Sequence, residues 1–308
     1  MSWLSAVAAA LVVVTPVVSA DLGGYLERSA TAEFSGEQLV ACDTPDGSRD
    51  AVFEVAQSEG VVAAWSAADD DSLVTVGLGT MATISGDQIA ATAVEGTDAD
   101  VDSPSYEIGS EESVTYLGRP AQDVAIRRDG VERVRLTVDV DTEAVVRTQT
   151  FLENGSLYCD RRLLSFEPDA AAELPDRAEI DVDPASPMES SPAALPATTQ
   201  GFDLLDTYQL DDGTLSYYSD GFFSLGVVVT DRPVQFGAVE DVVSVTTDSG
   251  EYQRLYSAGR VTVVWETGSE NLALIGDLPP DLVEGVLADL PAPVDAGFFE
   301  RIWMRLFG

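Results

Sequence analysis

Apolar and polar residues alternate with a period of two along most of the chain, which is typical of half-buried strands in an antiparallel sheet. The segment 121–166 shows this most clearly, because the tight-turn pairs Asp129-Gly130 and Asn154-Gly155 separate its alternating runs. It predicts a meander with one apolar face and one face rich in arginine. The strands expected up to the end of this meander span residues 38–42, 51–57, 61–65, 72–78, 88–94, 121–128, 134–140, 144–152 and 156–166.

Three other segments interrupt this alternation. Residues 22–32 have the spacing of a short amphipathic helix. Residues 95–112 are acidic and rich in turn formers, so we expect a surface loop there. Residues 168–201 contain six prolines and no periodicity, which indicates a linker between two domains, part of which can dock on its neighbours.

A second domain is expected over residues 202–290, where shorter alternating runs resume. The pair Pro279-Pro280 opens a predicted helix over 281–290, because the first turn of a helix accepts proline. The expected strands span 204–210, 214–219, 222–230, 242–247, 251–257, 261–266 and 272–275. The predicted fold class is α+β with mostly antiparallel β structure. The predicted layout is a signal peptide (1–20), an N-terminal domain (21–167), a linker (168–201), a C-terminal domain (202–290) and a tail (291–308).

The first twenty residues resemble a secretion signal. Leu4–Val18 is apolar and has the length of a signal-peptide core, although the three residues before it carry no basic charge. Residues 18–20 fit the small-residue cleavage pattern, so we expect export to the periplasm or cell-wall zone; a buried N-terminal helix is the alternative. Export would allow Cys42 and Cys159 to form a disulfide bond. Two buried free thiols are the alternative.

The composition limits the chemistry that this chain can carry out. It has no histidine and no lysine, and all sixteen basic residues are arginine. This excludes histidine-based nucleophiles, imidazole metal ligands and lysine Schiff bases. Two carboxylates could hydrolyse a glycoside, but 54 acidic residues make chance pairs unavoidable. We therefore expect no catalytic residues, no metal and no cofactor, and the net charge of −38 argues against binding nucleic acid.

Half of the arginines, eight of them, lie between Arg119 and Arg162. On the predicted meander, Arg133 and Arg135 belong to the polar face, which can receive an acidic partner segment or lipid headgroups. Cross-strand pairing with nearby aspartate and glutamate is the alternative. Arg119 lies between a glycine and a proline, where the backbone is constrained. We expect it to anchor a loop or the second domain by bidentate pairing.

Two apolar features suggest binding surfaces. The one-sided N-terminal sheet must curl over a helix, a partner or a ligand, so a leftover groove can hold an acyl chain; a filled core is the alternative. Residues 297–308 would place six large apolar side chains on one broad helical face, which suggests docking to a membrane surface or a partner. Packing on the chain's own domain is the alternative. The six are Phe298, Phe299, Ile302, Trp303, Leu306 and Phe307.

The stretch YLGRPAQDVAIRRDG at 116–130, with RLTVDVDTEAVVRTQTFLENG at 135–155, resembles the RseB/MucB family of extracytoplasmic regulators. FSGEQLV at 34–40, YYSDGFFSLGVVV at 217–229 and LALIGDLPPDLVEGVLADL at 272–290 resemble further parts of the family pattern in the same order. The resemblance covers nearly the whole mature chain. One departure is Ala144, which stands where the family's D-x-x-T turn has threonine.

The resemblance implies a half-open β-barrel of LolA/LolB type that clasps a helix, followed by a smaller α+β domain. In the family the C-terminal domain binds the extracytoplasmic part of an anti-sigma factor and shields it from proteolysis. The barrel is associated with a lipid-like or misfolded-lipoprotein signal. We therefore expect a non-enzymatic regulator of an envelope stress response; a lipid or lipoprotein carrier of LolA type is the alternative. The candidate partner-binding residues are Arg119, Arg133, Arg135, Tyr218, Asp220 and Phe222.

Overall fold

The computed structural model describes 29, 31–58, 61–66, 69–77, 80–85, 88–93, 106–168, 186–187, 195–210, 213–231, 241–247, 250–257, 259–268 and 270–294. Between 61 and 93 it describes the side chain of Ala64 alone. The predicted signal peptide, nearly all of the predicted helix over 22–32 and the six candidate docking residues of the tail lie outside the described residues.

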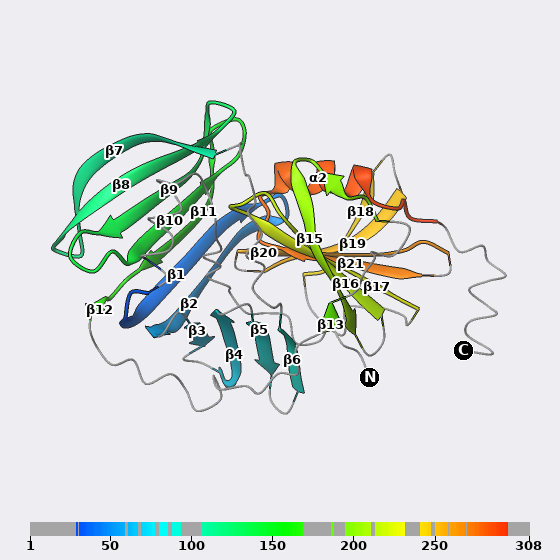
Figure 1. Cartoon of the computed structure of the whole chain (residues 1–308), viewed down its shortest axis with the longest axis horizontal. Coiled ribbons are helices and arrows are strands. Elements are labelled where there is room, and N and C mark those ends of the chain that lie inside the picture. The colour runs from blue at the N-terminus through cyan, green and yellow to red at the C-terminus, as the bar shows by residue number, and fades with distance from the viewer. Residues whose placement is uncertain are drawn as a thin grey trace.

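The first sheet is an open, antiparallel sheet of twelve strands (Figure 1). Its order is β6-β5-β4-β3-β2-β1-β11-β10-β9-β8-β7, and β12 pairs with the start of β1. Strands β6 and β7 therefore form its two edges. The bounds are β1 (Phe34–Thr44), β2 (Gly47–Ser58), β3 (Val61–Ser66), β4 (Asp69–Gly77), β5 (Thr80–Ser85), β6 (Gln88–Ala93), β7 (Tyr106–Tyr116), β8 (Arg119–Arg128), β9 (Val131–Asp139), β10 (Val145–Phe151), β11 (Leu157–Leu163) and β12 (Glu167–Pro168).

The second sheet is antiparallel with nine strands, in the order β13-β15-β16-β17-β21-β20-β19-β18, with β14 beside β15. The bounds are β13 (Ser186–Pro187), β14 (Thr198–Thr199), β15 (Phe202–Leu210), β16 (Gly213–Ser219), β17 (Ser224–Thr230), β18 (Val243–Thr247), β19 (Gly250–Ser257), β20 (Arg260–Glu266) and β21 (Asn271–Gly276). Helix α2 (Pro280–Asp289) follows β21 and lies along this sheet (Figure 1). None of the described helical segments is long and apolar enough to span a bilayer.

The two sheets share one apolar core. The cluster takes Val124, Ile126 and Val134 from β8 and β9, and it continues through Leu274 of β21 to Val286 of α2. All five side chains are fully buried. The apolar face of the meander is therefore covered by the second sheet and its helix. A smaller cluster belongs to the first sheet alone; its members include Phe34, Val40, Phe53, Val146 and Leu163.

Every predicted strand overlaps a strand of the structure, because the period-two alternation is strong in both sheets. The surface loop predicted over 95–112 is wrong for its second half. Strand β7 begins at Tyr106, whose ring is buried in the shared core while most of the following side chains are exposed. Strand β5 was not predicted, because the strand is only six residues long and its alternation of apolar residues is weak. Within the predicted linker, β13 and β14 pair with β15, so part of this segment docks on the second sheet.

Candidate functional site at the junction of the two sheets

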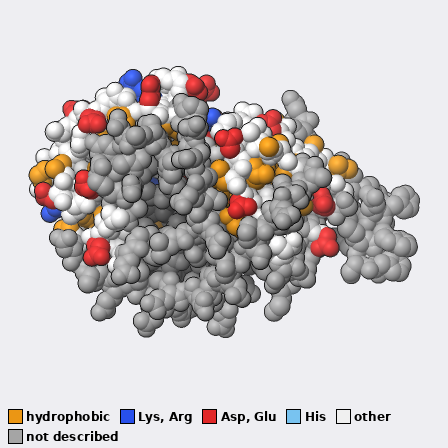
Figure 2. Space-filling model, viewed as in Figure 1, with side chains coloured by type: hydrophobic (Ala, Val, Ile, Leu, Met, Phe, Trp, Pro, Cys, Tyr) orange, Lys and Arg blue, Asp and Glu red, His pale blue; other side chains and the backbone are white. Residues whose placement is uncertain are grey.

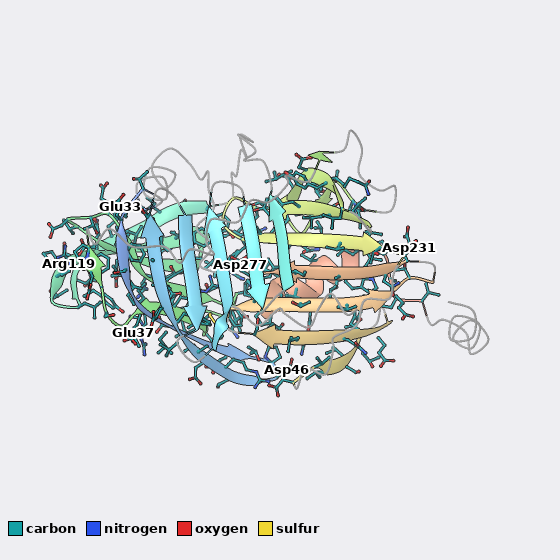
Figure 3. The ribbon with its side chains drawn as sticks, turned by 90° about the horizontal axis from the view of Figure 1, so that it is seen from below. Glu33, Glu37, Asp46, Arg119, Asp231 and Asp277 are labelled. Atoms are coloured by element: carbon teal, nitrogen blue, oxygen red, sulfur yellow. A yellow bond between two sulfur atoms is a disulfide. The ribbon has the colours of Figure 1, made fainter. Side chains whose placement is uncertain are left out.

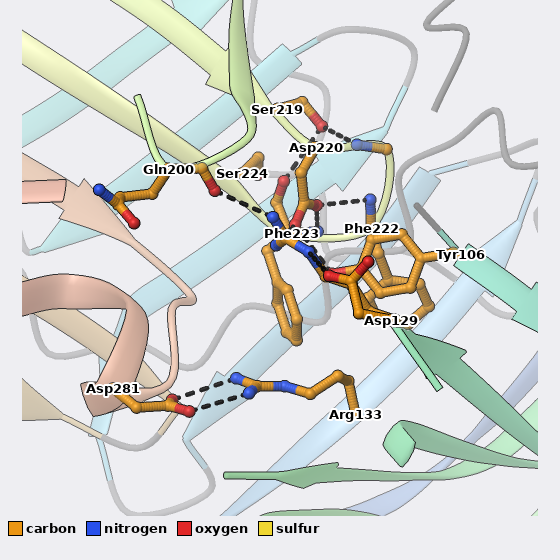
Figure 4. A network of polar contacts seen from close by, with 12 residues as sticks. Tyr106, Asp129, Arg133, Gln200, Ser219, Asp220, Phe222, Phe223, Ser224 and Asp281 are labelled. Carbon is orange, nitrogen blue, oxygen red and sulfur yellow. Dashed lines mark hydrogen bonds and ion pairs between the residues drawn. The ribbon is translucent and has the colours of Figure 1, made fainter. Parts of the chain in front are cut away.

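The loop between β16 and β17 positions Asp220 at the junction of the two sheets (Figure 4). The Oδ1 atom of Asp220 accepts hydrogen bonds from the backbone amides of Phe222 (3.0 Å) and Phe223 (2.8 Å). Ser219 Oγ donates to the carbonyl of Phe223 at 3.0 Å. Gly221 has φ 90°, a backbone conformation that glycine adopts without a steric penalty. These local bonds hold the loop closed and leave the second carboxylate oxygen facing the first sheet.

The second oxygen of Asp220 binds residues of the first sheet. Its Oδ2 atom accepts a hydrogen bond from the Tyr106 hydroxyl (2.8 Å) and pairs with Arg128 Nη1 (2.8 Å). Arg128 also donates from Nη2 to the carbonyl of Gln200 at 2.9 Å. The ring of Phe222 packs against that of Tyr106, with centroids 5.7 Å apart. The Asp220 carboxylate therefore connects β7 and β8 to the β16–β17 loop, and Arg128 extends the contact to the residues just before β15.

Burial sets the electrostatics of this contact. The side chain of Asp220 is 0% exposed, and that of Arg128 is 15% exposed. Burial raises the pKa of Asp220, and the hydrogen bonds from the loop amides and Tyr106, together with Arg128, offset only part of that rise. Burial and the nearby Asp220 carboxyl raise the pKa of Tyr106 well above its usual value, so the hydroxyl stays a donor. The contact is a hydrogen-bonded buried network, which is strong only while every member keeps its partner.

A second contact joins β9 to helix α2. Arg133 donates from Nη1 and Nη2 to the two carboxylate oxygens of Asp281, at 2.9 and 3.1 Å (Figure 4). The backbone amide of Glu153 also donates to Asp281 at 2.8 Å. Asp281 lies in the first turn of α2, where a negative charge is favourable. The bidentate geometry fixes the position of α2 relative to the meander.

Further polar contacts cross the junction near the β19–β20 turn. Arg254 forms a bidentate pair with Asp46 in the β1–β2 turn, at 2.7 and 3.3 Å. Arg161 Nη2 donates to the carbonyl of Gly259 at 2.6 Å. Close by, burial lowers the pKa of Arg260 to about 10 and raises that of Asp277. The junction therefore combines the shared apolar core with charged contacts on several sides of it.

The structure brings together three of the six candidate partner-binding residues. Arg133, Asp220 and Phe222 all contribute to the junction. Tyr218 is fully buried beneath it, where its hydroxyl donates to the carbonyl of Pro196 at 2.8 Å. In this arrangement these side chains contact the chain itself; Arg133, Tyr218 and Asp220 are buried and Phe222 is partly buried.

The other two candidates lie away from the junction. Arg119 is at the far end of the first sheet, where it forms a bidentate pair with Asp139 (2.7 and 3.1 Å) and contacts Asp141 at 3.2 Å. It anchors a loop of its own sheet, one of the two roles expected for it. Arg135 pairs with Glu132 at 2.6 Å. The six apolar residues of the tail lie outside the described residues.

Other polar groups of the meander pair across strands. Arg147 forms a bidentate pair with Asp160 on β11 at 2.7 and 3.0 Å, and Arg162 contacts the same carboxylate at 2.6 Å. Cys42 on β1 and Cys159 on β11 lie directly opposite one another and form a disulfide bond. The arginine-rich segment therefore serves two purposes: cross-strand pairing and contact with the second sheet.

Several junction residues could not be identified from the sequence. Tyr106 lies within the acidic segment 95–112, which indicated a loop, and Arg128 precedes a hairpin turn, a position typical of a solvated arginine. Asp281 carried a signal, because an acidic residue just after Pro279-Pro280 is favourable in a first helical turn. Its partner on β9 could not be inferred from that pattern. Among the described residues, no group of three or more acidic or cysteine side chains is placed to hold a metal ion.

Two open antiparallel sheets with a shared core and a helix over the second sheet define a two-sheet α+β protein. Its fold is that of MucB. MucB in the MucA/MucB complex of Pseudomonas aeruginosa matches with a TM-score of 0.53 and 19% identity, over 89% of this chain and 100% of that one. A structure of MucB alone matches with a TM-score of 0.51 and 19% identity, over 89% and 98% of the two chains. No family model and no curated protein sequence matches this chain.

A likeness to the LolA superfamily is weaker. A member from Nitrosomonas europaea matches at a TM-score of 0.22 and 9% identity, over 85% of this chain and 96% of that one. That score is too low to assign the first sheet to the superfamily. The assignment of the fold therefore rests on MucB, whose match includes both sheets of this chain.

Proposed function

We propose that this protein is an exported, non-enzymatic regulator that binds the extracytoplasmic part of an anti-sigma factor through residues 202–290. The observation that carries the proposal is the fold shared with MucB across both sheets, since MucB has been solved in complex with MucA. The sequence stretches at 217–229 and 272–290, which resemble the RseB/MucB family, form strands of the second sheet and helix α2. The junction then has a supporting role, because it fixes the second sheet and α2 in one orientation.

Within this region, the outer face of α2 is the surface we assign to the partner. Glu284 and Asp289 are exposed there, whereas Val283 and Leu287 face the core. Because α2 is pinned to the first sheet by Asp281, a partner on this face meets a preorganised surface, which reduces the entropic cost of binding.

The test uses the full chain and the extracytoplasmic segment of an anti-sigma factor encoded beside its gene. Isothermal titration calorimetry should show a saturable complex. Glu284→Arg on α2 should weaken it by about tenfold, the change expected when a charge at an interface is reversed. Glu112→Arg on the exposed part of β7 is the matched control and should leave the affinity unchanged. A wild-type chain that gives no heat of binding contradicts the function, whereas equal effects of the two variants contradict the assigned surface.

A second candidate function is the binding of a lipid-like signal by the first sheet. What favours it is that this sheet is open at β6 and β7 and has an apolar cluster of its own, with Phe34 and Phe53 among its members. Native mass spectrometry of the purified full chain should then detect a bound lipid that dissociates on activation in the gas phase. A single unliganded mass, unchanged after incubation with phospholipid micelles, contradicts this candidate.

A further inference from the structure

Three large apolar side chains are exposed at the end of the first sheet that lies farthest from the second sheet. Leu117 is 45% exposed, Val140 55% and Leu164 42%. Two hydrogen bonds place their segments together: the backbone amide of Val140 donates to the carbonyl of Pro120 (3.1 Å), and the side-chain hydroxyl of Tyr116 donates to the carbonyl preceding Leu164 (2.7 Å). We call these three residues the apolar rim. In Figure 2 this end, on the left, shows apolar side chains beside acidic and basic ones.

Leu117 occupies a backbone conformation that disfavours leucine. It forms a two-residue hairpin turn with Gly118, because Tyr116 pairs directly with Arg119. Its φ is 49° and that of Gly118 is 77°, so both turn residues are left-handed. Asparagine, aspartate and glycine are preferred at the first of these positions. The equivalent turn between β8 and β9 follows this preference with Asp129-Gly130.

Because Leu117 is both strained and exposed, asparagine at this position would serve the fold equally well or better. Backbone strain in a folded protein is concentrated at functional positions, and an exposed cluster of large apolar residues points to a contact with another molecule. The rim is also held rigidly. Arg119 pairs with Asp139 and Asp141 in the loop that carries Val140, and its guanidinium lies 5.6 Å from the ring centroid of Phe166. Rigid apolar side chains lose little entropy on docking.

The charges around the rim select its partner. Glu33 and Glu37 lie at the same end as Arg119 (Figure 3), and both are exposed, as are Asp141 and Glu143. Arg119 near the rim is engaged by Asp139 and Asp141, and Arg147 and Arg162 both pair with Asp160. This acidic border disfavours anionic lipid, and it also disfavours a second copy of a chain with net charge −38. It favours a surface that is apolar at its centre and basic at its edge.

We infer that the apolar rim is a docking point for a basic, amphipathic segment of another protein. Leu117 is its anchor, Val140 and Leu164 flank the anchor, and the exposed carboxylates receive the basic side chains. The rim lies at the end of the first sheet that points away from the junction, whereas α2 is bound at the junction itself, so this contact is separate from the one proposed for the anti-sigma factor and does not depend on it.

The test substitutes Leu117→Asn in the full chain, which creates a favoured Asn-Gly turn. The probe is a synthetic amphipathic helix of leucine and lysine, and its affinity is measured by fluorescence anisotropy. The variant should melt at a temperature about 1–3 °C higher than the wild type, because the turn strain is relieved. Its affinity for the probe should nevertheless fall by about tenfold or more, as expected when an interface anchor is removed. A purely structural leucine would not produce this opposite pair of changes.

The controls distinguish binding at the rim from nonspecific binding by exposed apolar residues. Leu157→Asn removes another exposed leucine (41%) at the opposite end of β11 and should leave the affinity unchanged. Val140→Thr, on the rim itself, should weaken binding in the same direction as Leu117→Asn. The inference is overturned if Leu117→Asn binds the probe as tightly as the wild type. It is equally overturned if the wild type prefers a leucine–glutamate helix, or if it binds phosphatidylcholine vesicles in a way that Leu117→Asn abolishes.

Discussion

At the scale of single residues, the Asp220 side chain both holds the β16–β17 loop closed and joins the two sheets. One oxygen binds two amides of its own loop, and the other binds Tyr106 and Arg128 of the other sheet. A buried charge of this kind is costly to desolvate, so the network gives specificity of orientation more than net stability. Arg133 and Asp281 repeat the arrangement at α2.

We expect Asp220→Asn to lower the free energy of unfolding by about 2–4 kcal/mol, because it leaves the partly buried Arg128 without its carboxylate. Urea denaturation followed by circular dichroism measures this change. Glu132→Gln is the matched control, since its partner Arg135 is 40% exposed and such pairs contribute less than about 1 kcal/mol. Equal losses in the two variants would contradict a special role for the buried network.

Asp139 should make the free energy of unfolding depend on pH in the acidic range. Burial raises the pKa of this carboxyl, but hydrogen bonds from Arg119 and Thr142 lower it by more, so the folded pKa lies below the ordinary value. The resulting stability is present above the unfolded pKa of about 4 and is lost as the pH falls through the folded pKa. The difference in unfolding free energy between wild type and Asp139→Asn should therefore shrink in acid. Urea titrations from about pH 7 down to pH 2.5 measure it, and a constant difference contradicts the assignment.

The sequence predicted part of the site at this scale. It identified Arg133, Asp220 and Phe222, through the polar face of the meander and the family-like stretch at 217–229. These residues were candidates for binding a partner, and in the structure their side chains contact the chain's own other sheet. A single sequence shows that a charged residue lies on a strand, but its partner at a separation of about a hundred residues depends on how the sheets meet. Tyr106 and Arg128 were missed for this reason.

At the scale of elements, the strands were predictable and their arrangement was not. Alternation places each side chain on one face of a strand, and it located β15 to β21 of the second sheet to within a few residues. Alternation carries no information about which strands are neighbours. The pairing of β1 with β11 brings the two ends of the first sheet's sequence together, and the disulfide Cys42–Cys159 lies in that pair.

This disulfide should stabilise the first sheet substantially. It joins positions 117 residues apart, and a crosslink over a long loop restricts the unfolded chain strongly. We expect the double variant Cys42→Ala, Cys159→Ala to lose about 2–4 kcal/mol of unfolding free energy. Equilibrium urea denaturation of the two proteins, each without reductant, gives the value. If the wild type and the double variant have the same free energy of unfolding without reductant, the disulfide does not stabilise the fold.

At the scale of the whole molecule, the shared core makes the two sheets interdependent. The apolar face of the meander was expected to cover a helix, a partner or a ligand, and in the structure the second sheet and α2 cover it. Within the described part of the chain, four ion pairs join the first sheet to the second sheet and α2 around that core: Arg128–Asp220, Arg133–Asp281, Arg254–Asp46 and Arg49–Asp241. Packed side chains therefore connect α2 directly to the first sheet.

This interdependence predicts that a substitution that destabilises one sheet also destabilises the other. Ile126 is fully buried in the shared core, and replacing it with alanine should cost about 3 kcal/mol. Hydrogen exchange followed by mass spectrometry should then show faster exchange in peptides from β20 and β21 as well as from β8 and β9, because both sheets open together. Leu274→Ala on β21 should give the same pattern from the other side, whereas Val52→Ala, which is 46% exposed, should change neither sheet. Faster exchange confined to the first sheet in Ile126→Ala would show that the two sheets unfold independently, and communication between α2 and the first sheet would then need another route.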